Sequence, residues 1–350
     1  MSGAGRTYLD WNATAPLRPE ARAAMVAAMD VVGNPASVHA EGRAARGLVE
    51  RARAQVAAAL GADGADIVFT SGATEAAALA LAGRGLVAGG VEHDAVAAWT
   101  DPVLPVDADG RVTVTDPARS TLQMANSETG VVQELPQGLA VSDLTQAFGK
   151  LPIAFNWLGC DMALVSAHKL GGPKGIGALV LRQGIDVTPT LRGGGQEMGR
   201  RAGTENVIGI AGFGAAAEAA ARDLAAGVWG EVAEIRNILI QALDPADQAT
   251  IFVGQSGACL PNTVCIATPG WKAETQVMQM DLAGFAISAG SACSSGKVRA
   301  SRVLTAMGLG ADVAASAIRV SIGPGVTREQ VLRFAEAWRR ARDRHRARAA

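Results

Sequence analysis

The sequence predicts an α/β fold with a mostly parallel sheet, followed by a smaller α+β domain. Up to about residue 225, short apolar runs alternate with helical patterns and Gly-rich turns, which favours parallel strands joined by helices. After that point the alternation gives way to long amphipathic helices with short strand-like runs between them. With 350 residues, 49% of them hydrophobic, the chain can bury the core of one large or two medium domains.

Hydrophobic periodicity predicts the individual elements. A surface helix is expected over 41–60, because apolar residues recur there at helical spacing and Gly61 follows as a stop. The first strand-to-helix unit has a strand at 67–69 and a helix that reaches about Leu81. Further strands are expected at 112–114, 122–125, 139–141, 162–165 and 177–181. The C-terminal part is expected to contain helices over 228–243 and 328–346 and strands at 262–267, 285–289 and 317–322.

Charge, hydropathy and cysteine spacing exclude several classes of function. The 32 basic and 33 acidic residues give a net charge of -1, so no nucleic-acid partner is expected. The longest stretch without a polar side chain, 207–217, is shorter than the roughly 20 residues that span a bilayer, so no membrane partner is expected. The N-terminus has an early Asp10 and no apolar segment typical of a secretory signal, which predicts a cytoplasmic protein. The four cysteines show no C-x-x-C spacing, so no metal site is predicted.

Lys169 is the first candidate for chemistry. With Ser166 and His168 it directly follows a predicted buried strand, and it precedes glycines that permit close approach of the backbone. Desolvation at such a strand end lowers the pKa of a lysine and favours the neutral amine that forms a Schiff base. A lysine that extends its charged end into solvent is the ordinary alternative. Only five of the 32 basic residues are lysines, so each of them is of interest.

Polar residues near other strand ends suit an anionic or cationic ligand. The segment SGATE places Thr74 and backbone N–H groups at a helix N-terminus, a site suited to phosphate, although such turns are also common helix caps. Asp143 ends another apolar strand and needs a hydrogen-bonding or cationic partner, such as a protonated pyridine nitrogen; a helix cap is the alternative. His93 in VEHDAV is by default a packed or surface histidine.

Two residues near the C-terminus are candidates for binding and nucleophilic chemistry. Cys293 lies among small polar residues, and an accessible thiol there becomes a nucleophile when a cation or dipole lowers its pKa. Arg319 lies within a short apolar strand, where its guanidinium needs a carboxylate, either that of a ligand or that of a structural ion pair. The remaining cysteines are typical of small buried hydrophobic residues.

These segments together resemble the cysteine desulfurases, class V enzymes of the fold-type I pyridoxal-phosphate group, in the NifS/IscS-like subgroup with a long cysteine-bearing loop. The motifs span nearly the whole chain in order and include YLDWNATAP, GNPASVH, TSGATE, VEHDAV, ETGVVQ, SAHKLGGPKGIGAL, GGGQEMGRRAGTEN, SAGSACSSG and IRVSIG. The resemblance implies a large domain at 14–225 with a mostly parallel seven-stranded sheet. It also implies a smaller α+β domain, formed by 1–13 and 226–350, that carries the cysteine loop.

The resemblance also implies a role for each candidate residue. Lys169 would carry pyridoxal phosphate and act in catalysis with His93, which would stack on the ring. Asp143 would pair with the pyridine nitrogen, and Gln146 would contact the phenolic oxygen. The residues implied at the phosphate or elsewhere around the cofactor are Ala73, Thr74, Ser127, Ser166, His168 and, from a second subunit, Thr204. The contribution from a second subunit implies a homodimer.

The implied substrate is L-cysteine. Arg319 would bind its carboxylate, with Asn34 and Thr14 nearby. Cys293 would take the sulfur as a persulfide, leaving L-alanine, and would deliver it to an acceptor protein, either an iron–sulfur scaffold or another sulfur carrier.

Two departures from the family pattern keep alternatives open. Ser127 stands where the family usually has an asparagine at the phenolic oxygen, and the connection 133–143 is too short for the usual crossover helix. A selenocysteine lyase, another class V enzyme or a non-catalytic binding or regulatory protein of the same fold are the alternatives. The joint presence of four residues favours the desulfurase: Lys169, Asp143, Cys293 and Arg319.

Overall fold

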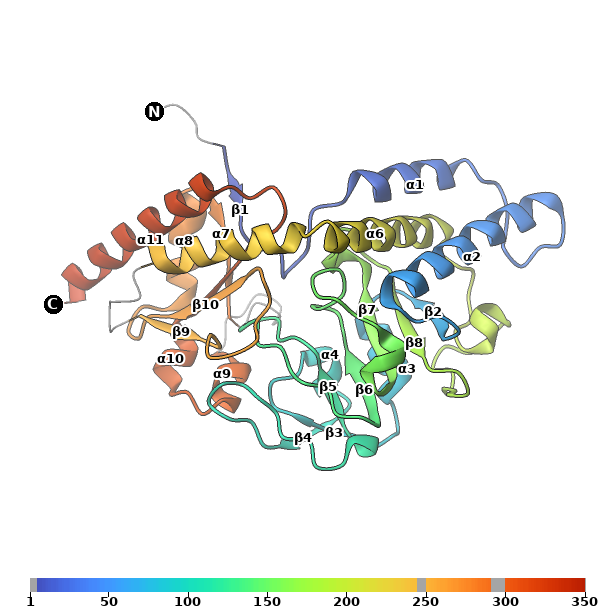
Figure 1. Cartoon of the computed structure of the whole chain (residues 1–350), viewed down its shortest axis with the longest axis horizontal. Helices are drawn as coiled ribbons and strands as arrows, with labels where there is room; N and C mark the ends of the chain where they lie inside the picture. The colour runs from blue at the N-terminus through green and yellow to red at the C-terminus, as the bar shows by residue number, and fades with distance from the viewer. Residues whose placement is uncertain (1–4, 244–249, 291–299, 350) are drawn as a thin grey trace.

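The computed structural model describes residues 5–243, 250–290 and 300–349. Figure 1 shows two groups of elements side by side: the helices α1, α2 and α6 lie on one side, and α7, α8 and α11 lie on the other. The N-terminal strand β1 (Thr7–Tyr8) pairs in parallel with β11 (Phe285–Ala286), so the start of the chain joins the C-terminal group. The division between 14–225 and the rest of the chain stays a prediction.

A mixed sheet forms the centre of the larger group. Its order is β2 (Asp66–Thr70), β8 (Gly177–Leu181), β7 (Cys160–Ser166), β6 (Leu139–Asp143) and β5 (Thr121–Gln123). A parallel pair, β3 (Val87–Gly89) and β4 (Asp101–Leu104), adjoins β5 through a parallel bridge between Val87 and Ser120. Among the described strands of this group, only β8 runs antiparallel to its neighbours. The prediction of a mostly parallel sheet is therefore confirmed; five of its strands are paired directly, and the pair β3 and β4, which adjoins through a single bridge, brings the number to the predicted seven.

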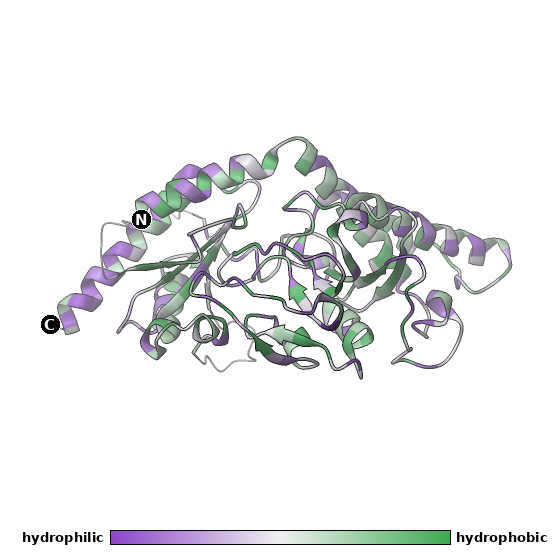
Figure 2. Cartoon of the chain, turned by 60° about the horizontal axis from the view of Figure 1, so that its bottom comes forward, coloured by the Kyte–Doolittle hydropathy of each residue, from purple (hydrophilic) through white to green (hydrophobic). Residues whose placement is uncertain are grey.

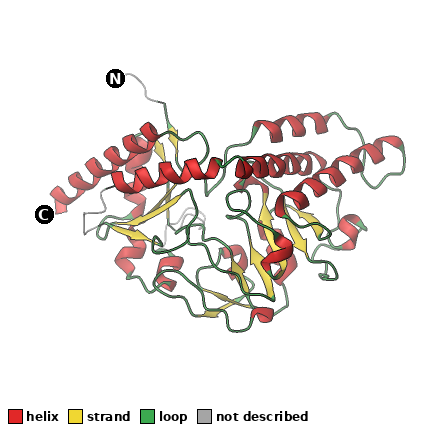
Figure 3. Ribbon diagram, in the orientation of Figure 1, coloured by secondary structure: helices red, strands yellow, loops and turns green. Residues whose placement is uncertain are grey.

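Helices cover both faces of this sheet (Figure 3). Phe69, Val165 and Val180 pack with α2 (Ala40–Leu60) and α6 (Val207–Ala225), against which α1 (Pro19–Met29) lies. The alternate strand residues, such as Val68 and Leu164, face α3 (Ala73–Leu81). Since strands buried on both faces need apolar side chains at every position, their sequences form continuous hydrophobic runs.

The C-terminal group is built on an antiparallel sheet. Its order is β12 (Ser288–Ala289), β13 (Ala317–Ser321), β10 (Thr263–Ala267) and β9 (Ile251–Val253). The helices that pack with it are α7 (Val228–Ala242), α8 (Ala273–Leu282) and α11 (Arg328–Ala349). Hydrophilic and hydrophobic residues alternate along α11 in Figure 2, because Phe334 and Trp338 are buried while its other face meets solvent.

The remaining elements are short: α4 (Asp94–Ala97), α5 (Phe155–Leu158), α9 (Arg302–Ala306), α10 (Ala311–Ser316) and the 3-10 helices Pro117–Arg119, Ala167–Lys169 and Gln196–Gly199. The connection 124–138 contains no helix, as its length predicts. The predicted strand at 112–114 is wrong, because Val112 forms only a single bridge, with Val106. Val106 and Val112 pack against a hydrophobic cluster that includes Leu304 and Met307. Within the described ranges, no helix combines the length and the apolar character needed to cross a membrane.

Candidate active site

A cavity of about 510 Å³ lies at the carboxyl ends of β2, β5, β6 and β7. The strands β6 and β7 are parallel neighbours, so Asp143 and Ser166 at their ends reach the same edge of the sheet. Lys169 follows Ser166 by three residues, in the 3-10 helix after β7. The cavity brings together ten of the predicted residues: Thr14, Ala73, Thr74, His93, Ser127, Asp143, Gln146, Ser166, His168 and Lys169.

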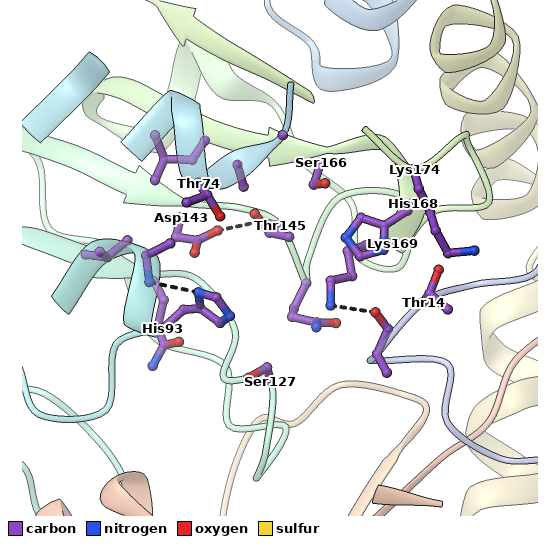
Figure 4. A pocket seen from close by; sticks show the side chains of 18 of the residues that line it. Thr14, Thr74, His93, Ser127, Asp143, Thr145, Ser166, His168, Lys169 and Lys174 are labelled. Atoms are coloured by element: carbon purple, nitrogen blue, oxygen red, sulfur yellow. Dashed lines mark hydrogen bonds between the residues drawn. The ribbon is translucent and has the colours of Figure 1, made fainter. Parts of the chain in front are cut away.

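Two sides of the cavity carry different chemistry. Figure 4 shows Asp143 and His93 on one side and Lys169, His168 and Lys174 on the other. The Lys169 amine donates to the carbonyl oxygens of Asn12, at 2.6 Å, and Ala13, at 3.0 Å. These carbonyls belong to the segment that follows β1, so the N-terminal chain holds the amine at the cavity.

Asp143 and His93 each support local backbone as well as lining the cavity. The buried Asp143 accepts a hydrogen bond at Oδ1 from the Thr145 backbone N–H, at 2.8 Å, so it also caps a turn. His93 precedes α4, and its Nδ1 accepts from the Ala95 backbone N–H at 3.1 Å. In the neutral imidazole the proton therefore lies on Nε2, and His93 offers a ring N–H donor.

Several polar groups at the cavity have no partner within the described part of the protein. They are Thr14 Oγ1, Thr145 Oγ1 and His168 Nδ1, all of which are buried. The helix α3 begins at Ala73 with no side-chain cap, so its first backbone N–H groups suit an anion. Burial lowers the pKa of His168 to about 4, and the charges of Lys169 and Lys174 act in the same direction.

This donor set fits pyridoxal phosphate. The start of α3 with Thr74 suits the phosphate dianion, and the Asp143 carboxylate suits a protonated pyridine nitrogen. The Lys169 amine on the other side suits the aldehyde carbon of the same molecule. No cluster of three metal-ligating side chains occurs among the residues that the structure describes.

Three predicted residues do not line this cavity, and a fourth cannot be placed. Asn34 is exposed in the connection between α1 and α2. Thr204 is also exposed and lines a second cavity of about 240 Å³, which shares Ser71 and Gly175 with the first. Arg319 is buried outside the lining. Cys293 lies outside the described residues.

Arg319 takes part in a structural ion pair. Its side chain is 3% exposed, and its Nη2 lies 2.8 Å from Asp10 Oδ1. Its Nη1 donates to the Ser127 carbonyl oxygen at 3.0 Å, and Ser127 does line the cavity. The alternative that the sequence left open, an internal carboxylate partner, is thus present, and the substrate role of Arg319 stays a prediction.

Sequence reasoning missed several residues of the site. Gln123, Thr145 and Lys174 line the cavity, and Lys150 is buried behind Gln146. Thr145 and Lys150 lie in the turns that directly follow Asp143. The end of the apolar strand, which identified Asp143 as a candidate, was therefore a signal for these two residues as well. Lys174 belongs to the same glycine-rich segment as Lys169.

Comparison with known proteins agrees with this geometry. The sequence profile of the family Aminotransferase class-V matches residues 7–334. A cysteine desulfurase of Cereibacter sphaeroides is 38% identical, with 95% of this chain and 94% of the relative aligned, and one of Frankia sp. (strain EuIK1) is 39% identical, with 95% and 90% aligned.

A solved structure supports the same assignment. The X-ray structure of a NifS-like protein from Rickettsia africae ESF-5 superposes with a TM-score of 0.88, at 32% identity, over 97% of this chain and 99% of that one. The chain therefore belongs to the class-V aminotransferase family of fold-type I, pyridoxal-phosphate-dependent enzymes, and it is similar over almost its whole length to cysteine desulfurases.

Proposed function

We propose that this protein is a cysteine desulfurase, which converts L-cysteine to L-alanine and passes the sulfur through Cys293 to an acceptor protein. One observation carries the proposal: Lys169, Asp143 and His93 converge on one cavity. The chain that contains this cavity is 38% identical to a cysteine desulfurase over 95% of its length.

Pyridoxal phosphate is the cofactor, and this chain's residues would hold it at both ends. Thr74, Ser166 and His168 would bind the phosphate, while Asp143 and His93 would contact the ring. When bound, the cofactor supplies an electron sink that stabilises negative charge on the substrate's α-carbon. A neutral His168 can donate one hydrogen bond to the phosphate without adding a further positive charge beside Lys169.

The Nζ atom of Lys169 would accept the proton from the substrate's α-carbon. The carbonyl oxygens of Asn12 and Ala13 accept hydrogen bonds from Nζ, and in its neutral form the amine has a lone pair that can accept a proton. They also orient the amine, since both come from one backbone segment. Orientation of a base at the reacting atom contributes to catalysis beyond the effect of its pKa.

Cys293 would take the sulfur. Its thiolate attacks the sulfur of the substrate, an S–S bond forms and the C–S bond breaks; the substrate carbon then takes up a proton and leaves as alanine. The role rests on the segment SAGSACSSG and on the family, because Cys293 lies outside the described residues. The acceptor of the persulfide sulfur would be an iron–sulfur scaffold or another sulfur carrier.

The proposed active form is a homodimer. Exposed apolar side chains gather on α1 and on the connection that follows it, among them Val26, Met29, Val32 and Val38. Thr204 would contact the partner's phosphate. Light scattering is expected to give twice the mass of one chain, and the mass of a single chain would contradict this. The cytoplasmic location stays a prediction.

The test of the activity is alanine and sulfide formation. Purified protein with pyridoxal phosphate, L-cysteine and a thiol reductant is expected to form both products. C293S is expected to keep the visible absorbance of the cofactor and lose sulfide release, whereas C259S serves as a matched control and is expected to keep both. K169A is expected to lose the absorbance, because the amine that binds the aldehyde is gone.

Three results would contradict parts of this proposal. Sulfide release that persists in C293S would place the nucleophile elsewhere. A colourless wild-type protein that ignores added pyridoxal phosphate would favour a binding protein of the same fold. Turnover of L-selenocysteine without turnover of L-cysteine would favour a selenocysteine lyase.

A further inference from the structure

Lys150 is a buried lysine that the proposed reaction does not use. Its side chain is almost completely buried, with 2% of the residue exposed. It lies four residues after Gln146, in the turns that follow β6. Because backbone bonds such as Phe148 N–H to Leu144 O make this segment locally helical, the side chains of Gln146 and Lys150 meet on one side.

The amine of Lys150 contacts the oxygen atoms of two amides. It donates to Gln146 Oε1 at 2.6 Å and to Asn12 Oδ1 at 3.1 Å. An amine that donates to an amide selects the oxygen and turns the NH2 group away. The Nε2 of Gln146 accordingly donates to the Asn12 backbone oxygen at 2.9 Å.

The same backbone oxygen also holds the Lys169 amine. Asn12 O accepts from Lys169 Nζ at 2.6 Å, so Lys150, Gln146 and Lys169 are connected through one residue. Gln146 lines the cavity, and its Nε2 has a second N–H for which the described residues supply no acceptor. That N–H is available to a ligand.

Burial of Lys150 needs an explanation beyond packing. Its pKa lies well below its ordinary value because of burial, with the charges of Lys169 and Arg319 acting in the same direction. No carboxylate forms an ion pair with it in the described parts of the chain. An apolar side chain of similar length would fill the space without this desolvation cost, so the donor groups of Lys150 are what distinguishes it.

We propose that Lys150 is a positioning residue: it fixes the amide of Gln146 so that an N–H of Nε2 is directed to the phenolic oxygen of bound pyridoxal phosphate. The inference rests on the proposed function, because it assumes that the cofactor binds in this cavity. Lys150 acts through Gln146 and touches neither substrate nor cofactor.

The experiment compares apo-protein of the wild type with K150M, Q146M and the double variant. Pyridoxal phosphate is added, and two quantities are measured: its dissociation constant and the pH midpoint of the visible absorbance of the bound cofactor. Each single variant is expected to bind about 10-fold more weakly, the effect of one lost hydrogen bond. The midpoint is expected to shift in the same direction in both, because the same N–H is misdirected or missing.

The double variant makes the test specific. If Lys150 acts through Gln146, the double variant is expected to match Q146M in both quantities, since coupled residues are not additive. The exposed Lys272 supplies the control, and K272M is expected to match the wild type. K150Q, whose amide can still donate to Gln146 Oε1, is expected to restore the wild-type midpoint; it also replaces K150M should that variant not fold.

Three results would overturn the positioning role while leaving the proposed function intact. One is a K150M protein with the wild-type affinity and midpoint. The second is a double variant whose changes are the sum of those of the single variants, and the third is a K150Q protein that behaves as Q146M does. A wild type that does not bind pyridoxal phosphate would overturn the proposed function together with this inference.

Discussion

At the scale of a single residue, Glu92 is a buried carboxyl group directly before His93 of the cavity. The side chain is fully buried, with Oε1 accepting from the Gln123 backbone N–H at 2.7 Å. Its Oε2 has no partner in the described protein. Burial raises the pKa of Glu92 to about 8, and the charge of Asp143 acts in the same direction. The carboxyl group is therefore mostly protonated in the folded protein at neutral pH.

This raised pKa predicts a pH-dependent effect of E92Q on stability. Between the ordinary carboxyl pKa of 4.5 and the raised value of about 8, the folded state binds more protons than the unfolded state, so the contribution of Glu92 to stability falls as pH rises. Glutamine stays neutral throughout. The free energy of unfolding of E92Q minus that of the wild type is expected to increase from about pH 5 to about pH 8, by a few kcal/mol at most.

Urea unfolding of apo-protein at several pH values measures this difference. The exposed Glu274 on α8 provides the control variant E274Q, whose difference from the wild type is expected to change much less with pH. A difference between E92Q and the wild type that does not change with pH would show that Glu92 keeps an ordinary pKa.

At the scale of elements, the contact between α2 and α6 depends on a glycine. A Cβ atom at Gly214 in α6 would lie 2.6 Å from Ala52 Cα and 2.7 Å from Ala52 Cβ in α2. These distances are shorter than any ordinary carbon–carbon contact, so the two helices approach each other closely because Gly214 has no side chain. The helix α6 also supplies Phe213 and Ala216 to the core beneath the sheet.

G214A is expected to lower the free energy of unfolding by about 1–3 kcal/mol, although alanine favours helix formation. The matched control is G230A in α7, where an added Cβ would meet nothing within 4 Å. That variant is expected to raise stability by up to about 1 kcal/mol. Thermal or urea unfolding measures both, and two stabilising substitutions would contradict the close contact of α2 and α6.

At the scale of the whole molecule, the N-terminal segment connects the two groups of elements. Asp10 pairs with Arg319 of β13 and accepts from Ser288 Oγ at 2.7 Å. Asn12 donates to Thr263 Oγ1 at 2.8 Å in β10 and presents its carbonyl oxygen to Lys169. One short segment therefore bonds to the C-terminal sheet and to the cavity.

Removal of the Asp10 carboxylate, the partner of the buried Arg319, is expected to affect the whole fold. D10A would leave the Arg319 charge buried without its partner, which is expected to lower stability by about 3–5 kcal/mol. The ion pair between Arg6 and Asp281 is the control, because its side chains are 57% and 56% exposed. D281A is expected to change stability by about 1 kcal/mol or less. Equal losses in the two variants, measured by urea unfolding, would contradict the difference in burial.

Much of the sheet and part of the site could be predicted from local pattern. The strand predicted at 177–181 matches β8, and those at 139–141 and 162–165 lie within β6 and β7. Their signal is strong because both faces are buried and every position is apolar. The prediction failed at 112–114, where Val112 and Val114 pack against hydrophobic clusters and only a single bridge, from Val112 to Val106, is formed.

From the sequence alone, most of the order of strands and helices and ten of the residues that line the cavity could be predicted, because periodicity, strand ends and glycine turns are local properties. Which groups meet depends on the tertiary structure. The partner of Arg319 lies 309 residues away, and the Asn12 oxygen that accepts from Lys169 lies 157 residues away. Such pairings depend on how the sheets and the N-terminal segment pack in space, and packing brings together residues whose separation in the chain carries no local signal.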